Sequence, residues 1–523
     1  MHTGPHPVAS RAGLIRGAVA VVAWVTLALG VSPTAAAAHL GTNDAVFEGR
    51  AGPYAVRVIV RMPGVIPGQA EVTVRVDGGA ARAVRVQVAQ WSVGTRGAPA
   101  PEAAMPVPGA AGVWSAPLWL MTTGSYEANV TVDGTQGTGT VTVPVVAVAT
   151  ARLGMDQRLG WLLAALGIVL VAGLVSVAGA AARDGTLTPG AAIDRAARRT
   201  GRVATAVAAA VCALALVGGA KWWGADDAAY ASGLWRPLRS EAHVRTGSGG
   251  PRLHFTITDS AWFAPELTPL MPDHGKLMHL FAVRESATAG ANVDPAHRSR
   301  DVLAHLHPVR VDRADFDAPL PALPGGRYRV YADVVHESGL ARTLVTTVDL
   351  AAPQVATPAG GSDAGDDAWD VAGAASAGAV APLGAGDGMT MESAARIPAG
   401  RDTVLRFTVR DAAGRVVDVE PYLGMAAHAM IERSDGSVFV HLHPSGTVSM
   451  AAQDRLLRRE QGDTALHGAS QPDAMAAMHG TPAAYSGALG FPFSFPRPGG
   501  YRVWVQVRIA GHVRTAAFDV TAI

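Results

Sequence analysis

The stretches YAVRVIV (Tyr54–Val60), EVTVRV (Glu71–Val76) and AVRVQV (Ala83–Val88) decide the fold class of this chain. In each of them apolar residues recur at every second position, and this alternation predicts a β-strand with one buried face. Gly and Pro separate the stretches at short intervals, which is typical of a β-sandwich. We therefore predict a sandwich over residues 39–150.

The C-terminal half of the chain contains an internal repeat. The stretch LHFTITD (Leu253–Asp259) matches LRFTVRD (Leu405–Asp411), and the tetrapeptide His-Leu-His-Pro occurs at His305–Pro308 and again at His441–Pro444. Repetition of this kind indicates two copies of one structural unit. We expect each copy to be a sandwich of its own.

Each copy ends with a glycine turn followed by a tyrosine, at Tyr328 and Tyr501, and the first domain ends similarly at Tyr126. A tyrosine at this place in a sandwich often hydrogen-bonds to the backbone a few residues upstream. We therefore expect all three domains to be variants of one sandwich.

The expected fold class is mainly β, with three immunoglobulin-like or cupredoxin-like β-sandwich domains plus two transmembrane α-helices. The second sandwich is expected at residues 241–350 and the third, its repeat, at residues 389–523. Residues 351–388 between them are rich in Ala, Gly, Asp and Pro and have few large apolar side chains. Such a composition cannot bury a core, so it predicts a flexible linker.

The N-terminus has the pattern of a secretory signal peptide. Arg11 and Arg16 precede an apolar stretch, and small residues follow at Ala35–Ala38. A signal peptide over residues 1–38 would leave His39 as the first residue of the mature chain. A cut one residue earlier and an uncleaved anchor are the alternatives.

Two apolar segments are long enough to cross a membrane, at residues 159–182 and 203–221. The loop between them, residues 183–202, has five Arg and two Asp, and an excess of arginine marks the cytoplasmic side. This topology predicts a protein of the cytoplasmic (inner) membrane whose large domains face the periplasm or another extracytoplasmic space. Neither apolar core contains an ionisable side chain, which favours an anchor over a transporter.

Composition excludes several classes of partner and site. Charged residues make up 16% of the 523 residues and the net charge is +1, so nothing indicates a nucleic-acid partner. The one cysteine, Cys212, excludes a disulfide framework and a thiolate metal site of the CxxC kind. Metal chemistry in this chain must therefore use His, Met or carboxylates.

The two His-Leu-His-Pro elements are the candidate metal sites. Residues i and i+2 of a strand share one face, so His305 and His307 lie side by side. A third imidazole, His279, is expected on the adjacent strand at cross-strand distance. The second copy supplies the same set. The predicted ligands are His279, His305 and His307 in one copy and His428, His441 and His443 in the other.

Three convergent neutral imidazoles suit Cu(II) or Zn(II). Methionine and histidine at Met475, Met478 and His479 suit Cu(I), so copper is favoured and zinc is the alternative. His274 and an N-terminal His39 are further candidate ligands. Two other interpretations of the repeated histidines stay open: hydrogen-bonded structural pairs and pH-responsive groups.

The stretch LMHLF (Leu277–Phe281), with His305–Pro308 and the Gly-Arg-Tyr-Arg-Val hairpin, resembles bacterial exported proteins with YtkA-like or FixH-like domains. The stretch Glu420–His443 resembles the same class, and the general plan is loosely similar to periplasmic copper-resistance proteins of the CopC type. These are small sandwiches, mostly uncharacterised. The resemblance to FixH implies metal supply to respiratory oxidases, although two central helices and duplicated domains depart from the single-helix layout of that family.

These features predict a membrane-anchored extracytoplasmic metal-binding protein that acts in metal tolerance, storage or delivery. The alternative is a non-enzymatic interaction scaffold that docks an envelope protein partner and whose His pairs are structural. We expect no enzyme, because the sequence has no nucleophile elbow, phosphate loop or HExxH helix. A mononuclear copper redox enzyme is the third and least favoured class.

Overall fold

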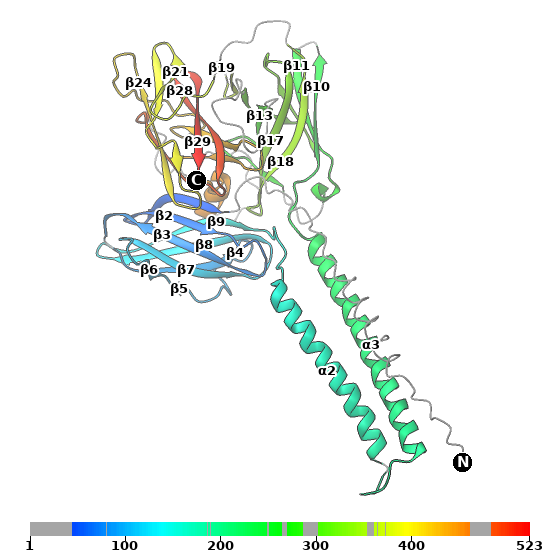
Figure 1. Cartoon of the computed structure of the whole chain (residues 1–523). Coiled ribbons are helices and arrows are strands. Elements are labelled where there is room, and N and C mark those ends of the chain that lie inside the picture. Colours follow the sequence, from blue (N-terminus) through cyan, green and yellow to red (C-terminus); the bar gives the residue numbers. More distant parts are fainter. Residues whose placement is uncertain are drawn as a thin grey trace. The chain divides into compact units, whose positions relative to one another are not determined.

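The structure is a computed structural model in which residues 44–79, 81–185, 187–188, 190–247, 250–263, 269–285, 302–352, 360–362, 365–371, 373–460 and 483–523 are described. It is mainly β, with several sheets and two long apolar helices (Figure 1). The chain divides into two compact units, residues 1–38 and 39–523. The expected signal peptide and four candidate ligands, His39, Met475, Met478 and His479, lie outside the described residues.

Two sheets share one core in the N-terminal part of the second unit. Every second residue of the long strands points into this core, as the period-two pattern predicts. The first sheet has the order β1 (Ala45–Ala51), β2 (Tyr54–Arg61), β3 (Gly68–Val76), β7 (Val113–Leu120) and β6 (Met105–Pro106). The second has the order β5 (Glu102–Ala103), β4 (Ala81–Gln90), β8 (Gly124–Gly134) and β9 (Gly137–Ala147), and a 3-10 turn, η1 (Asp77–Gly79), precedes β4.

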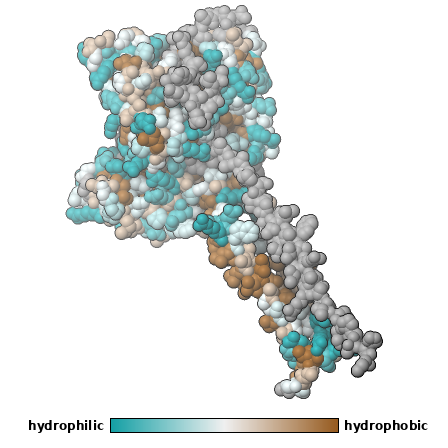
Figure 2. Space-filling view, in the orientation of Figure 1, coloured by the Kyte–Doolittle hydropathy of each residue, from teal (hydrophilic) through white to brown (hydrophobic). Residues whose placement is uncertain are grey.

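Two helices follow, α2 (Gln157–Asp184) and α3 (Arg195–Ser232). Both are long and apolar enough to cross a membrane, and Figure 2 shows hydrophobic side chains gathered on the helical part of the molecule. Asp156 and Asp194 cap their first turns by accepting backbone N–H groups. α3 is longer at both ends than the predicted span of residues 203–221. The flanking sequences are rich in Ala and Arg and contain no proline, so the helix propagates through them.

Two further sheets share the core of the second β domain. We call the two copies of the internal repeat, which are the second and third β domains, the second repeat and the third repeat. One has the order β10 (Ser240–Gly247), β11 (Gly250–Ile257), β16 (Asp315–Pro319) and β15 (Val309–Arg310), and the 3-10 turn η2 (Ser260–Phe263) follows β11. The other has the order β12 (Leu270–Met271), β17 (Gly326–His336), β13 (His279–Arg284), β14 (Leu303–Leu306), β20 (Ala368–Asp370) and β19 (Gly360–Ser362), with β18 (Ala341–Leu350) paired to β17.

The third repeat has the corresponding arrangement around its own core. One sheet has the order β21 (Val380–Gly384), β22 (Asp387–Met391), β24 (Thr403–Arg410) and β27 (Ala488–Phe493). The other has the order β23 (Arg396–Ile397), β29 (His512–Ala522), β28 (Gly499–Ile509), β25 (His428–Arg433) and β26 (Phe439–Leu442). A short helix, α4 (Met450–Glu460), follows the second His-Leu-His-Pro element.

The region expected as a flexible linker, residues 351–388, differs from that expectation. Its described part contains β19, β20 and β21 and the start of β22. β20 pairs with β14, so it extends the sheet of the second repeat beside His305. The composition argument failed here because an added edge strand is held by backbone hydrogen bonds and by one or two side chains, such as the buried Ala368.

The predicted hydrogen bonds of Tyr328 and Tyr501 are confirmed, and Tyr126 makes the same contact. The hydroxyl groups of Tyr126, Tyr328 and Tyr501 each donate to the carbonyl oxygen four residues upstream, at 3.0, 2.6 and 2.7 Å. The three β regions thus share a contact that is typical of sandwiches.

Candidate metal centre

Strand pairing brings the predicted histidines together. β13 and β14 are antiparallel neighbours in which Leu280 lies opposite Leu306, so the next position sets His279 against His307. In the third repeat Ala429 lies opposite Leu442, which sets His428 against His443. The expectation of a third imidazole on the adjacent strand is therefore confirmed in both copies.

The two sets of histidines meet where the second and third repeats contact each other. An apolar cluster spans this contact and includes Phe281 and Tyr331 of the second repeat and Phe439 and Trp504 of the third. The rings of Tyr331 and Phe439 are stacked, with centroids 3.9 Å apart. Next to the cluster, the rings of His279 and His441, one from each repeat, have centroids 5.1 Å apart.

The first group consists of His279, His305 and His307. One ring nitrogen from each residue lies within 4.8 Å of the others, and all three side chains are buried. The closest pair is His279 Nδ1 and His305 Nε2, at 3.2 Å. Ligands on one ion have metal–nitrogen bonds near 2 Å, so small ring rotations would bring all three nitrogens to bonding distance.

The second ring nitrogen of each histidine in this group contacts an acceptor. His279 Nε2 lies 3.1 Å from the carbonyl oxygen of Asp273, and His305 Nδ1 lies 2.9 Å from Gln506 Oε1. His307 Nδ1 lies 2.8 Å from Asp367 Oδ1. We assign the proton of each ring to the nitrogen that faces an acceptor. The Tyr422 hydroxyl also lies 3.2 Å from His305 Nδ1, and it donates its own proton to the carbonyl oxygen of Asp366.

The assigned tautomers leave three lone pairs directed at one another. His279 Nδ1 and His305 Nε2 are both unprotonated, so their 3.2 Å contact cannot be a hydrogen bond between neutral rings. His307 Nε2 is buried and has no hydrogen-bond partner among the described residues. Convergent lone pairs without a donor could hold a cation, and acceptors on the outer nitrogens are the usual support of metal-bound histidines.

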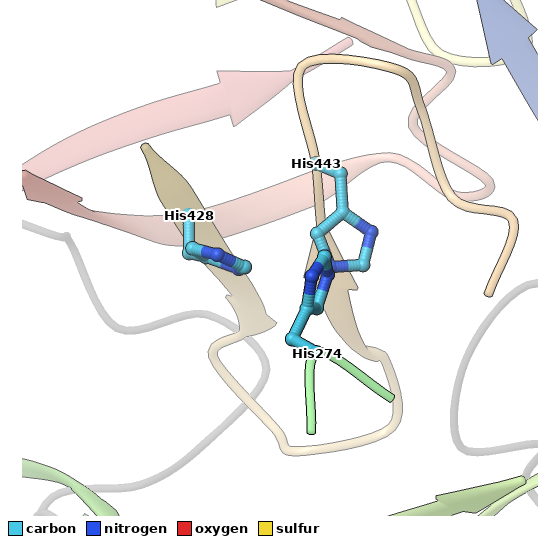
Figure 3. A group of neighbouring side chains, drawn as sticks. All are labelled: His274, His428 and His443. Carbon is cyan, nitrogen blue, oxygen red and sulfur yellow. The ribbon is translucent and has the colours of Figure 1, made fainter. Parts of the chain in front are cut away.

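The second group consists of His274, His428 and His443, whose side chains lie close together in Figure 3. His274 Nε2 lies 3.4 Å from His443 Nε2. His428 Nε2 lies 3.1 Å from the carbonyl oxygen of Tyr422, which leaves its Nδ1 as the inner lone pair. This group joins the two repeats, because His274 comes from the second and the other two from the third.

The composition of the second group differs from the predicted triad of His428, His441 and His443. His441 lies beside the group, with its Nε2 3.2 Å from His428 Nδ1. His274 takes the third place because it lies in a turn between Asp273 and Lys276 that reaches across to the other repeat. Nothing in the spacing of the sequence indicates that crossing.

The same turn occurs in the third repeat, at Tyr422–Met425, with a leucine in place of the histidine. His274 and Gly275 have φ values of 51° and 78°, and Leu423 and Gly424 have 50° and 80°. Each turn is closed by the same pair of backbone hydrogen bonds. The two repeats thus present one backbone geometry, and a single residue difference supplies the extra imidazole.

Burial keeps these histidines neutral. It lowers the pKa of His279 to about 4 and that of His443 to about 3, with neighbouring histidines adding to the effect. Burial also holds the pKa values of His305, His307, His428 and His441 well below the usual value. Neutral imidazole is the form that binds metal, so protons compete weakly at these rings near neutral pH.

Sequence reasoning missed the acceptors that orient the rings. Asp367 lies in the segment expected as a linker, and Gln506 and Tyr422 belong to the other repeat from the histidine they contact, His305. Gln506 lies opposite His428 on β28, as Asp333 lies opposite His279 on β17. That shared register marks Gln506 and Asp333 as equivalent positions of the two repeats, and it gives no indication of Asp367 or Tyr422.

Comparisons with known proteins give a family for one part of the chain. The family described as Domain of unknown function (DUF8832) matches residues 384–523, which is the third repeat. A search of curated proteins found no match.

Similar solved structures include an engineered protein, with 31% identity over 16% of this chain and 17% of that one, and a TM-score of 0.14. The FN1–FN3 domains of chicken CNTN1 are 8% identical over 88% of this chain and 97% of that one, with a TM-score of 0.13. Dimeric latent PorU from Porphyromonas gingivalis is 8% identical over 92% of this chain and 34% of that one, with a TM-score of 0.13. The chain thus spans about a sixth of the engineered protein, and scores this low carry no argument about fold or function.

Proposed function

We propose that this protein binds metal ions outside the cytoplasm and is held to the membrane by α2 and α3. Copper is the favoured ion and zinc the alternative, and the proposed role is tolerance, storage or delivery without catalysis. The proposal includes three immunoglobulin-like or cupredoxin-like sandwiches, and a cytoplasmic-membrane location with the β domains on the periplasmic or extracytoplasmic side. The arginine-rich loop between the helices supports this orientation.

One observation carries the proposal. His279, His305 and His307 direct three lone pairs at one another, and an acceptor on each outer nitrogen fixes this arrangement. A structural histidine pair would place a proton between the two rings as a hydrogen bond. Imidazole nitrogens suit copper and zinc, and the methionines proposed to add Cu(I) affinity are Met475 and Met478.

The direct test is metal stoichiometry of the full-length chain in detergent, measured by equilibrium dialysis against Cu(II) or Zn(II) and elemental analysis. The wild type is expected to bind two ions. His307→Ala should remove the ion of the first group, and His274→Leu, which copies the Leu423 turn, should remove the ion of the second. His243→Ala changes an exposed histidine of β10 and should retain both ions. A wild type that binds no metal stoichiometrically would refute the proposal.

A second candidate is a scaffold that docks an envelope protein partner, with the histidines as structural groups. It is favoured by the polar contacts that join the repeats, such as His305 with Gln506 and with Tyr422. In that case His307→Ala would unfold or loosen the metal-free protein, and its circular dichroism melt would fall without any change in metal content. Recovery of a stable protein partner from metal-depleted cells would support the same interpretation.

A further inference from the structure

A cavity of about 200 Å³ lies beside the second histidine group. Its wall is built from three regions of the chain: Asp44 and Val146 of the N-terminal β region, Asp333 of the second repeat, and His441 and His443 of the third. The N-terminal region has no predicted ligand of its own among the described residues. The cavity gives this region a contact with the metal centre.

The wall of the cavity is acidic. Its described lining includes three carboxylates, Asp44, Asp273 and Asp333, and one arginine, Arg342. Asp333 Oδ2 lies 3.8 Å from His441 Nδ1, and Asp273 Oδ1 accepts the backbone N–H of Ala451 at 2.8 Å. Burial raises the pKa of Asp333 to about 7, so this carboxylate is largely ionised at pH 8. At that pH the cavity has an excess of negative charge between low-dielectric walls, and such a hollow concentrates cations.

The buried imidazoles make an access route necessary. His443 is 3% exposed and lines the cavity. Its Nε2 faces His274 in the second group. The cavity thus connects a carboxylate-lined space with a ring of the metal group.

We propose that this cavity is the route by which a metal cation reaches and leaves the group of His274, His428 and His443, with Asp333 and Asp273 attracting the ion. The proposal rests on the proposed metal-binding function. It assigns the N-terminal β region a role as one wall of the route. It also makes the second group the exchanging site of the pair.

A substitution that fills the cavity tests the route. Ala341 lies on the cavity wall and is exposed at the start of β18, so Ala341→Trp would obstruct the space without touching a ligand. A bulky side chain in the cavity raises the free-energy barrier for entry and for exit of the ion, and it leaves the free energies of the bound and unbound states unchanged. Uptake and release of Zn(II) by the second group should therefore both slow about tenfold at an unchanged Kd. Asp349→Trp, at an exposed position on the same strand outside the lining, is the matched control and should keep wild-type rates.

The rates are measured on the full-length chain in detergent by stopped-flow mixing with Zn(II), and by transfer of Zn(II) to an excess of a colorimetric chelator. At pH 8, where most Asp333 side chains are ionised, Asp333→Asn keeps the shape of the side chain and removes its charge. It should slow uptake about fivefold to tenfold at low salt, and the difference should shrink at high salt.

The outcomes separate this proposal from the function on which it rests. Two bound ions with unchanged exchange rates in Ala341→Trp would overturn the route and leave the metal-binding function standing. Unchanged uptake in Asp333→Asn at low salt would overturn the electrostatic part, and this variant keeps the test decisive if Ala341→Trp does not fold. Absence of any bound Zn(II) in the wild type would overturn both.

Discussion

At the scale of single residues, the outer contacts of the histidines matter as much as the histidines themselves. One outer nitrogen of each ring donates a hydrogen bond, to the Asp273 carbonyl oxygen, to Gln506 or to Asp367. The opposite nitrogen of each ring therefore has its lone pair facing inward. Two neutral rings held in these tautomers repel each other in the absence of a cation. The metal-free protein therefore keeps an unfavourable contact that a bound ion would relieve.

The Asp367 carboxylate should control affinity at the first group. Asp367→Asn keeps the size of the side chain but replaces a charged acceptor beside His307 Nδ1 with a neutral amide. Loss of such a partner typically costs about 10- to 100-fold in metal affinity, and we expect a loss in this range for one of the two ions. Competition titration against a chelator measures it, with the exposed Asp349→Asn as control. Equal affinities in the two variants would contradict the assigned tautomer.

The buried histidines also make the stability of the metal-free protein depend on pH. The pKa of His279 is lowered by burial to about 4, whereas the unfolded chain takes up this proton near pH 6.5. As the pH falls from 6.5 to 4 the unfolded state binds a proton that the folded state does not, so stability falls across this window. This histidine alone accounts for about 3 kcal/mol of the loss.

Urea unfolding in the presence of EDTA at several pH values between 7.5 and 4 measures this effect. His279→Phe, which does not titrate, should flatten the dependence. A wild-type free energy of unfolding that stays constant from pH 7.5 to 4 would show that the histidines are not held neutral by burial.

At the scale of elements, small residues set the packing of the two long apolar helices, α2 and α3. A Cβ atom added to Gly179 of α2 would lie 2.0 Å from Thr205 Oγ1 of α3, and one added to Gly201 would lie 2.9 Å from the carbonyl oxygen of Gly179. Both glycines are buried in the helix pair. Close approach at small residues is a general way for helices to associate in lipid, where the hydrophobic effect gives no driving force.

We expect Gly179→Val to separate α2 from α3 at this contact, because the added methyl groups cannot avoid Thr205. Denaturation of the helices in increasing SDS, followed by circular dichroism, should shift to lower detergent. The control is Gly173→Val on the same helix, where an added Cβ meets nothing within 4 Å. Identical transitions for the two variants would mean that Gly179 is not a packing contact.

At the scale of the whole molecule, the candidate metal centre belongs to a contact between two copies of one fold. Asp333 and Gln506 occupy the same strand position in their respective repeats, and each points to the first histidine of the His-Leu-His-Pro element in the other. The contact is therefore close to two-fold symmetric. His274 and Leu423 break this symmetry, so the two histidine groups are not equivalent.

Because the second group contains residues of both repeats, a bound ion should stabilise the pair as one unit. Zn(II) at 100 times its Kd adds about 3 kcal/mol per site, and this should appear as slower hydrogen exchange in both β13 and β25. In His274→Leu the protection given to β25 by metal should shrink while that of β13 remains. Metal protection confined to one repeat in the wild type would contradict a site shared between them.

The local sequence pattern was enough to predict the strands, the two long helices, the tyrosine contacts and the shared face of His305 and His307. Each of these depends on residues close in sequence, or on a strand period that the chain itself displays. The pairing of His279 with His307 also followed, because the two segments form neighbouring strands of one repeat. The composition of residues 351–388 misled, since edge strands need few apolar side chains.

The tertiary structure alone decided which residues complete each histidine group. His274 and His443 are separated by 169 residues and His305 and Gln506 by 201, and no periodicity in the sequence connects such positions. Sequence alone indicated two His-Leu-His pairs and two single histidines, divided equally between two repeated units. How those units contact each other decides which lone pairs converge. The contact depends on an apolar surface formed by Phe281, Tyr331, Phe439 and Trp504. Apolar burial is non-directional, so it determines how the two repeats dock, and the polar groups then pair within that contact.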